Sequence, residues 1–239
     1  MTTLSDTTRA RLAAVSTATL CTALFKRGLR NQFIQDVRPL NAGLPNMVGP
    51  AYTLRYIPAR EDLNPIKVFE DPKHPQRVAV ETCPAGAVLM IDSRKDARAA
   101  SAGSILVTRL MKRGVAGVVT DGGFRDSPEI ARLSMPAYHQ RPSAPTNLTL
   151  HQAMDLNVPI GCGDVAVFPG DIVVGDAEGV VVIPAGIADD IAQEAHEMTA
   201  FEDFVTSEVL DGRSIAGLYP PTDPATRERY AAWRTQHGR

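Results

Sequence analysis

The chain has few cysteines and no long apolar run. Its three cysteines, Cys21, Cys83 and Cys162, lie far apart and form no CxxC pair, so neither a zinc site nor a dithiol redox motif is indicated. No uninterrupted apolar run of about 18 residues occurs. The N-terminal segment mixes charged side chains into a helical pattern, which differs from a signal peptide. We therefore predict a soluble protein of the reducing cytoplasm with no membrane partner.

The chain also lacks an excess of charge of either sign. Its 25 basic and 27 acidic side chains give a net charge of -2, which does not supply the basic surface that nucleic-acid binders use. We predict no nucleic-acid partner. The 18 glycines and 18 prolines among 239 residues, with 44% hydrophobic residues, exclude collagen, coiled coil and wholesale disorder. A chain of this length buries a core without disulfides or a structural metal.

The familiar catalytic motifs are missing. The sequence has no GxGxxG, Walker loop, HExxH or GxSxG, so NAD, ATP, zinc-protease and serine-hydrolase functions lose their usual support. Its five histidines fall at no metal-ligand spacing. Ordinary surface or core roles are therefore expected for them.

An α/β pattern begins after Pro84. The apolar runs 87–91 and 115–120 are typical of buried strands, and residues 101–113 between them have a helical composition. So short a crossover predicts a parallel pair with the helix on one face. Ligands of such sheets collect beyond the carboxyl ends of the strands, which here places them at residues 121–126.

The remaining segments suggest one domain with a C-terminal arm. A helix is expected from an N-cap at Thr17 to a stop at Gly28. The four prolines of residues 58–76 indicate an excursion from the core rather than a helix or central strand. Short strands in hairpins are expected after Pro136, followed by a helix over residues 187–204 and a polar tail.

Charged residues are concentrated after the second predicted strand. Asp121, Arg125, Asp126 and Glu129 surround a glycine-rich turn, where a backbone approaches a ligand closely. Carboxylate oxygens of this kind suit Mg²⁺ or Mn²⁺. The alternative is that Asp126 and Glu129 only stabilise the start of the next helix, paired with Arg125.

A second feature is the start of the helix between the two strands. Gly103, Ser104, Ile105 and Leu106 stand where unpaired N–H groups bind a carboxylate. The alternative is a plain helix start. An anion pocket beside a hard metal and a fixed arginine is what a metal-dependent reaction on a 2-oxo acid needs.

These two motifs, in this order and spacing, resemble the RraA-like family. The family includes metal-dependent 4-hydroxy-4-methyl-2-oxoglutarate/4-carboxy-4-hydroxy-2-oxoadipate aldolases and the regulators of RNase activity. The surrounding segments 113–122 and 169–184 agree with it, and the resemblance extends roughly over residues 17–204. It implies an α/β fold, an αββα sandwich of the swivelling β/β/α type.

The resemblance also implies an organisation and an assembly. Residues 1–204 would form one RraA-like catalytic domain, and residues 205–239 an arm that packs on a neighbouring subunit. The expected assembly is a homotrimer or a dimer of trimers with active sites between subunits.

The resemblance further implies roles for the site residues. Arg125 would hold the pyruvyl moiety, and Asp126 would bind Mg²⁺ or Mn²⁺. The backbone amides of residues 103–106 would take the substrate carboxylate, while Asp121 and Glu129 would lie around this pair and orient it. Arg125 and the cation would stabilise a pyruvate enolate in aldol cleavage or in oxaloacetate decarboxylation.

Two departures from the family aldolases weigh on the activity. Ser104 stands where those enzymes often have an acidic residue, and a serine does not carry a proton as a carboxylate does. Arg213 aligns with a C-terminal glutamate of the aldolases. Glu208 is the alternative candidate for the role of that glutamate. Decarboxylation needs no base to deprotonate a hydroxyl, so it tolerates these changes better than aldol cleavage.

Two other functions compete with the metal-dependent lyase. A Schiff-base aldolase needs a buried lysine, and none of the five lysines, Lys26, Lys67, Lys73, Lys95 and Lys112, lies in an apolar strand. A non-catalytic regulator that binds an RNA-degrading enzyme is the alternative to a lyase. Ser104 and Arg213 favour it, whereas the retained Arg125 and Asp126 favour an enzyme.

Overall fold

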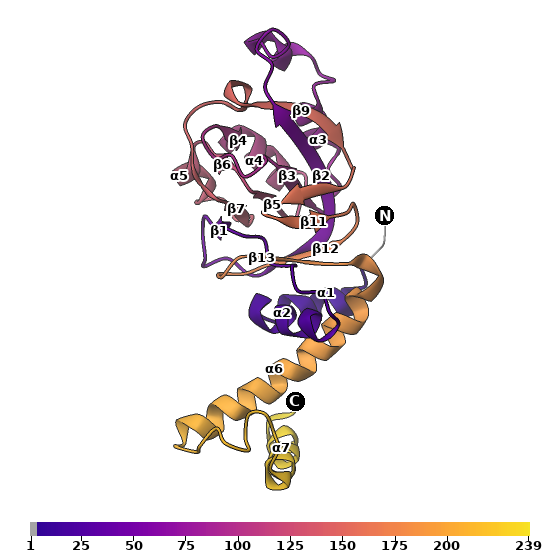
Figure 1. Ribbon diagram of the computed structural model, residues 1–239, viewed down its shortest axis with the longest axis vertical. Coiled ribbons are helices and arrows are strands. Elements are labelled where there is room, and N and C mark those ends of the chain that lie inside the picture. The colour runs from indigo at the N-terminus through magenta and orange to yellow at the C-terminus, as the bar shows by residue number, and fades with distance from the viewer. Residues whose placement is uncertain (1–3) are drawn as a thin grey trace.

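A mixed sheet forms the centre of the molecule in the computed structural model, which describes residues 4–239 (Figure 1). The strand order is β1-β7-β5-β3-β2-β12-β13, with β9 also paired to β2. The strands are β1 (Arg38–Pro39), β2 (Met47–Pro58), β3 (Val88–Asp92), β5 (Gly117–Thr120), β7 (Ala137–His139), β9 (His151–Leu156), β12 (Ile172–Gly175) and β13 (Val180–Ile183). Strands β2, β3, β5 and β7 run parallel to one another.

The predicted strand–helix–strand unit is confirmed. Strands β3 and β5 pair in parallel, and helix α4 (Ser104–Lys112) connects them. The helix begins three residues later than predicted, because Ala100–Ala102 forms strand β4. In a small parallel sheet, β4 pairs with β6 (Gly123–Phe124), which pairs with β8 (Arg141–Pro142). This sheet places the residues that follow β4 and β6 side by side.

Helices and a hairpin cover the sheet. Helix α3 (Pro75–Thr82) packs with α4 over an apolar cluster that includes Leu89, Val118 and Phe124. The hairpin of β10 (Ile160–Cys162) and β11 (Val165–Val167) contributes to a second cluster. Helices α1 (Asp6–Ala13), α2 (Thr17–Lys26) and α6 (Ala188–Leu210) bury a third cluster with β12 and β13. The predicted α/β sandwich is therefore confirmed.

Two segments differ in detail from the sequence predictions. The N-cap of α2 is Ser16, whose side chain accepts from Thr19 N–H; Thr17 instead donates from its amide and its hydroxyl to Asp176. The excursion leaves the core at the end of β2 and returns at Pro75, which starts α3 because proline is tolerated in the first helical turn.

The C-terminal arm contains a helix that the sequence analysis missed. Helix α6 continues to Leu210, six residues beyond the predicted end, and the polar tail forms α7 (Pro224–His237). Tyr230 and Trp233 of α7 pack against Phe204 of α6, with ring centroids 5.4 and 6.0 Å apart. Figure 1 shows α6 extending away from the sheet and α7 at the far end of the molecule from α5.

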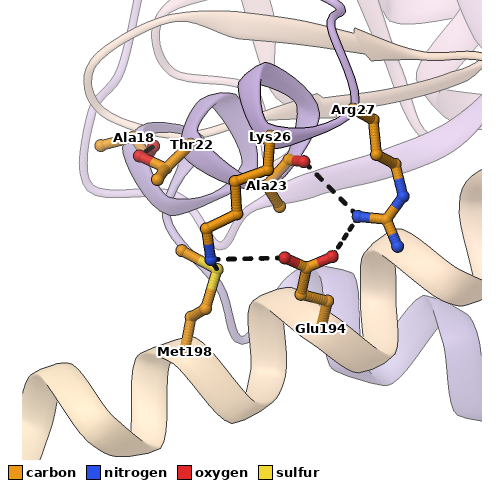
Figure 2. A network of polar contacts seen from close by, with 7 residues as sticks. All are labelled: Ala18, Thr22, Ala23, Lys26, Arg27, Glu194 and Met198. Atoms are coloured by element: carbon orange, nitrogen blue, oxygen red, sulfur yellow. Dashed lines mark hydrogen bonds and ion pairs between the residues drawn. The ribbon is translucent and has the colours of Figure 1, made fainter.

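Ion pairs hold the near half of α6 to the body. Lys26 and Arg27, at the end of α2, both pair with Glu194 of α6, and Lys26 Nζ lies 3.4 Å from Glu194 Oε1 (Figure 2). Short elements complete the chain: α5 (Ser127–Ile130) and the 3-10 turns Ile66–Glu70, Asn147–Thr149 and Ala185–Ile187. None of the helices within residues 4–239 has the length and apolar character to cross a membrane.

Candidate active site

Gly103 brings two loops into contact. It is the N-cap of α4, and a Cβ at this position would lie 2.8 Å from Arg125 Cγ and 2.9 Å from Asp126 Oδ2. Arg125 N–H donates to the carbonyl of Ala102 at 3.1 Å. A side chain at residue 103 would therefore displace both charged residues, which explains the glycine.

Asp126 is held at the start of α4 by backbone geometry. Its φ of 56° lies in the left-handed region, which aspartate visits more readily than most residues. The Ser104 amide and hydroxyl each donate to Asp126 Oδ2 at 3.2 Å. Arg125 Nε lies 3.7 Å from Asp126 Oδ1, and both side chains remain partly exposed. The structure therefore brings together the arginine and the aspartate of the sequence prediction.

The start of α4 keeps part of its anion-binding capacity. Of the four predicted amides, that of Ser104 is taken by Asp126, which corrects one element of the expectation. The first N–H groups of a helix have no acceptor within the helix. Those of Gly103, Ile105 and Leu106 have no acceptor elsewhere in the described chain. Three of the four amides are thus free to bind a carboxylate.

A pocket of about 360 Å³ lies over these residues. It is lined by Phe69, Gln76, Arg77, Ala100, Ala102, Gly103, Ile105, Leu106, Arg125, Asp126, Thr146 and Asn147. We call Gly103, Ile105, Leu106, Arg125 and Asp126 the first wall. Phe69, Gln76, Arg77 and Asn147 form the second wall.

None of the residues of the second wall was among the predicted site residues. Its residues come from the excursion, the first turn of α3 and the 3-10 turn at residues 147–149. Asn64 ties these segments together, since its amide donates to the carbonyls of Leu148 and His151. The only sequence signal was an aromatic and an arginine, Phe69 and Arg77, close to a proline-rich segment.

Two amide atoms in the second wall have no hydrogen-bond partner. Gln76 Nε2 donates to Tyr56 Oη at 3.0 Å and to the Ser101 carbonyl at 2.8 Å, which fixes the orientation of the amide. Its Oε1 remains without a donor, and Asn147 Nδ2 without an acceptor. Both side chains are nearly fully buried, at 2% and 4% exposed. Buried polar atoms of this kind usually have partners.

Asp121 makes no hydrogen bond to Arg125 or Asp126, contrary to the expectation that it orients this pair. Its carboxylate accepts from the backbone amides of Ser93, Lys95 and Gly163 at 2.7 to 3.2 Å. Burial raises its pKa to about 6, against the lowering effect of those hydrogen bonds. Its side chain therefore ties its own loop to the loops of residues 93–95 and 163.

The side chains of the other predicted acidic residues form no hydrogen bond or ion pair with Arg125 or Asp126 in the described chain. Glu129 is exposed on α5, and its side chain makes no hydrogen bond or ion pair with any described residue. Glu208 pairs with Arg213 and Arg229, at 2.5 and 2.9 Å, within the arm. No group of three or more His, Cys, Asp or Glu side chains gathers to hold a metal among residues 4–239.

The fold is an α/β sandwich, and its pocket has free helix amides and a carboxylate on adjoining loops. The chain belongs to the RraA-like family, whose model, described as Aldolase/RraA, matches residues 17–182. A protein of Halalkalibacterium halodurans named "Putative 4-hydroxy-4-methyl-2-oxoglutarate aldolase" is 32% identical over 182 residues, 76% of this chain and 80% of its own. A protein of Burkholderia mallei with the same name is 33% identical over 59% of this chain and 76% of its own.

Solved structures share the fold. The Streptomyces coelicolor protein RraAS2, described as an unusual member of the RNase ES inhibitor RraA family, has a TM-score of 0.74 and 28% identity, over 85% of this chain and 98% of its own. An uncharacterised Pseudomonas syringae protein has a TM-score of 0.77 and 20% identity, over 92% and 100%. The proteins similar to this chain therefore include ones named as aldolases and one described as a member of an RNase inhibitor family.

Proposed function

We propose that this chain is a cytoplasmic, divalent-metal-dependent carbon–carbon lyase. It would act on 2-oxo acids through a pyruvate enolate, by aldol cleavage of 4-hydroxy-2-oxo acids, by decarboxylation of oxaloacetate, or by both. The observation that carries the proposal is the first wall, where Arg125 and Asp126 meet the start of α4 in one pocket. The aldolase names of its relatives support the same reaction class.

Asp126 fits a hard divalent cation. It offers carboxylate oxygens, and Mg²⁺ is usually bound through one or two carboxylates while it keeps several waters. The Asp126 side chain is 38% exposed, which leaves room for those waters. When bound there, Mg²⁺ or Mn²⁺ supplies Lewis-acid stabilisation of developing negative charge. The exposed Glu129 would interact through the surrounding waters.

The chain's own residues would bind and stabilise the reacting end of the substrate. The free amides of Ile105 and Leu106 hold the carboxylate of the 2-oxo acid. Arg125 donates to the 2-oxo oxygen, which gains negative charge as the carbon–carbon bond breaks. Donors fixed in advance at such a position stabilise the transition state more than the ground state.

The two candidate reactions differ in their need for a base. Aldol cleavage must remove the proton of the 4-hydroxyl group, and Ser104, which donates to Asp126, is not a base at neutral pH. Oxaloacetate decarboxylation needs only stabilisation of the enolate. The first wall supplies this stabilisation for both.

We propose a trimer or a dimer of trimers as the assembly, with the arm at an interface. Large apolar side chains are exposed there, at Leu210, Ile215 and Tyr219, and packing against another subunit would bury them. Light scattering should give a mass of three or six chains. A monomer would contradict this assembly.

Pyruvate release tests the reaction. Oxaloacetate and 4-hydroxy-4-methyl-2-oxoglutarate are each incubated with the protein and Mg²⁺ or Mn²⁺, with and without EDTA. Release that stops in EDTA and returns with excess metal is the expected result. Release that ignores EDTA would refute the metal dependence, and no release from either compound would refute both reactions.

A regulatory function is the second candidate, favoured by the likeness to RraAS2. It predicts a stable complex with an RNA-degrading endonuclease and a lower rate of RNA cleavage. Substitution of Arg125 should leave that inhibition unchanged, because the pocket has no part in it. Inhibition without pyruvate release would favour the regulator over the lyase.

A further inference from the structure

Arg77 has an unusual electrostatic position in the second wall. It lies in the first turn of α3, where the helix dipole disfavours a cation. It forms no ion pair with an acidic residue of the described chain. Its guanidinium lies 4.6 Å from the ring centroid of Phe69, and the Phe69 and His74 rings form a T-shaped pair. The charge is thus held at the pocket without an acidic partner among residues 4–239.

The second wall adds a neutral donor and an acceptor to this charge. Asn147 Nδ2 and Gln76 Oε1 are both buried without a partner in the described chain. Their residues line the pocket, so a bound ligand is the partner available to them. A cation and an N–H donor suit a carboxylate. An acceptor suits a hydroxyl group. Together with the first wall, the lining residues carry two guanidinium groups and one carboxylate, which leaves an excess of positive charge.

We propose that the second wall binds the far carboxylate of a 2-oxo dicarboxylate, with Arg77 selecting its charge. This inference rests on the proposed lyase function for its kinetic part only. The substrate would place its 2-oxo acid end on the first wall and its second carboxylate on Arg77 and Asn147. Gln76 Oε1 would accept from a hydroxyl group between the two ends.

This placement favours aldol cleavage over decarboxylation. In aldol cleavage the C3–C4 bond breaks, its electron pair stays on C3 as the pyruvate enolate, and the C4 hydroxyl loses its proton to become a carbonyl. The enolate is then protonated at C3. The far carboxylate leaves unchanged on the second product, so Arg77 holds it throughout. In oxaloacetate the far carboxylate itself becomes CO₂, and a cation that stabilises it in the ground state slows this step.

Binding of two five-carbon acids tests the charge selection directly. 2-Oxoglutarate and 2-oxopentanoate differ only by a carboxylate in place of a methyl group, and calorimetry in Mg²⁺ buffer measures both. We expect the wild type to prefer 2-oxoglutarate by about tenfold or more. Arg77→Met should abolish the preference, and Arg77→Lys should keep part of it. Arg60→Met is the matched control, since Arg60 is an exposed excursion residue paired with Asp62.

The kinetic arm uses the 4-hydroxylated forms of the same acids. Arg77→Met should lower kcat/KM for 4-hydroxy-2-oxoglutarate by about 10- to 100-fold, and for 4-hydroxy-2-oxopentanoate by less than about threefold. An equal fall for both, or a wild type that binds both acids equally, would overturn the proposal. A binding preference that depends on Arg77, without pyruvate release from either substrate, would refute the lyase but support the subsite.

Discussion

The two walls of the pocket are built in different ways. The first wall stands on strands β4 and β6 and the start of α4, and backbone bonds and the close approach at Gly103 fix its charged groups. The second wall comes from the excursion and a 3-10 turn. It carries a cation and two amides whose polar atoms are not all satisfied within the chain.

This difference suggests a division of roles: the first wall stabilises the transition state, and the second wall selects the substrate. Groups that stabilise a transition state must be fixed before the substrate arrives, and the first wall provides this. Groups that select between substrates need only form hydrogen bonds or ion pairs that one substrate offers and the other lacks. The unpaired groups of the second wall are of this kind. Loss of a first-wall charge should therefore slow every substrate, whereas loss of Arg77 should affect dicarboxylates alone.

The largest effect is expected at Arg125. Arg125→Ala removes the donor to the developing oxyanion, so turnover should fall on the order of 100-fold or more for both mono- and dicarboxylate substrates. Single-turnover pyruvate release measures it, with thermal unfolding as the check on folding. Arg125→Lys, which keeps the charge, should recover part of the rate. A fall in turnover that is restricted to dicarboxylate substrates would show that the two walls do not have different roles.

Asp126 should govern metal affinity. Asp126→Asn tolerates the left-handed backbone and removes the negative charge, so Mn²⁺ binding by calorimetry should weaken at least about tenfold. Glu129→Gln is the matched control on the neighbouring helix and should change the affinity less, because its side chain makes no hydrogen bond or ion pair with Arg125 or Asp126 in the described chain. Unchanged Mn²⁺ affinity in Asp126→Asn would show that the metal does not bind at the first wall.

The sequence predicted the first wall because local patterns define it. Two apolar runs and a short helical segment specify a parallel unit, and the residues after its strands meet at one edge. Gly103, Arg125 and Asp126 could be placed on this basis. Asp121 was misplaced because the strand pattern gives its position but not the direction of its side chain, which turns to three backbone amides.

The second wall and the packing of the arm could not be predicted from single segments, because they form through contacts between segments that are far apart in the sequence. Arg77 and Asn147 lie on opposite sides of the β3–α4–β5 unit in sequence, and only the tertiary fold brings them together. Helix α7 was missed because its composition is polar. Its N-cap at Asp223 and the spacing of Tyr230, Trp233 and His237 carried a helical signal.

A smaller effect on turnover is expected from Gly103→Ala. The added Cβ would lie 2.8 Å from Arg125 Cγ, so the arginine must shift and turnover should fall on the order of tenfold. Gly186→Ala is the matched control, because a Cβ there meets no atom within 4 Å. Equal kinetics of the two variants would show that the first wall is not held by this close approach.

The smallest effect on turnover is expected at Asp121, below the first wall. Asp121→Ala leaves three buried amides without an acceptor, so the free energy of unfolding should fall by at least about 2 kcal/mol. Turnover per folded molecule should change less than about threefold, since none of the hydrogen-bond partners of Asp121 lines the pocket. Denaturant unfolding measures the stability and pyruvate release measures the turnover. The control is Asp155→Ala, which removes a half-buried carboxylate paired with Arg55.

The pH dependence sharpens the same test. The pKa of Asp121 in the folded chain is about 6, above its ordinary value of 3.8, so the native state binds the extra proton between these values. The stabilising contribution of Asp121 is then full below pH 3.8 and is lost as the pH rises through 6. The stability difference between wild type and Asp121→Ala should therefore shrink from pH 4 to pH 7. A difference that grows over this range would show that hydrogen bonding, rather than burial, dominates at this carboxylate.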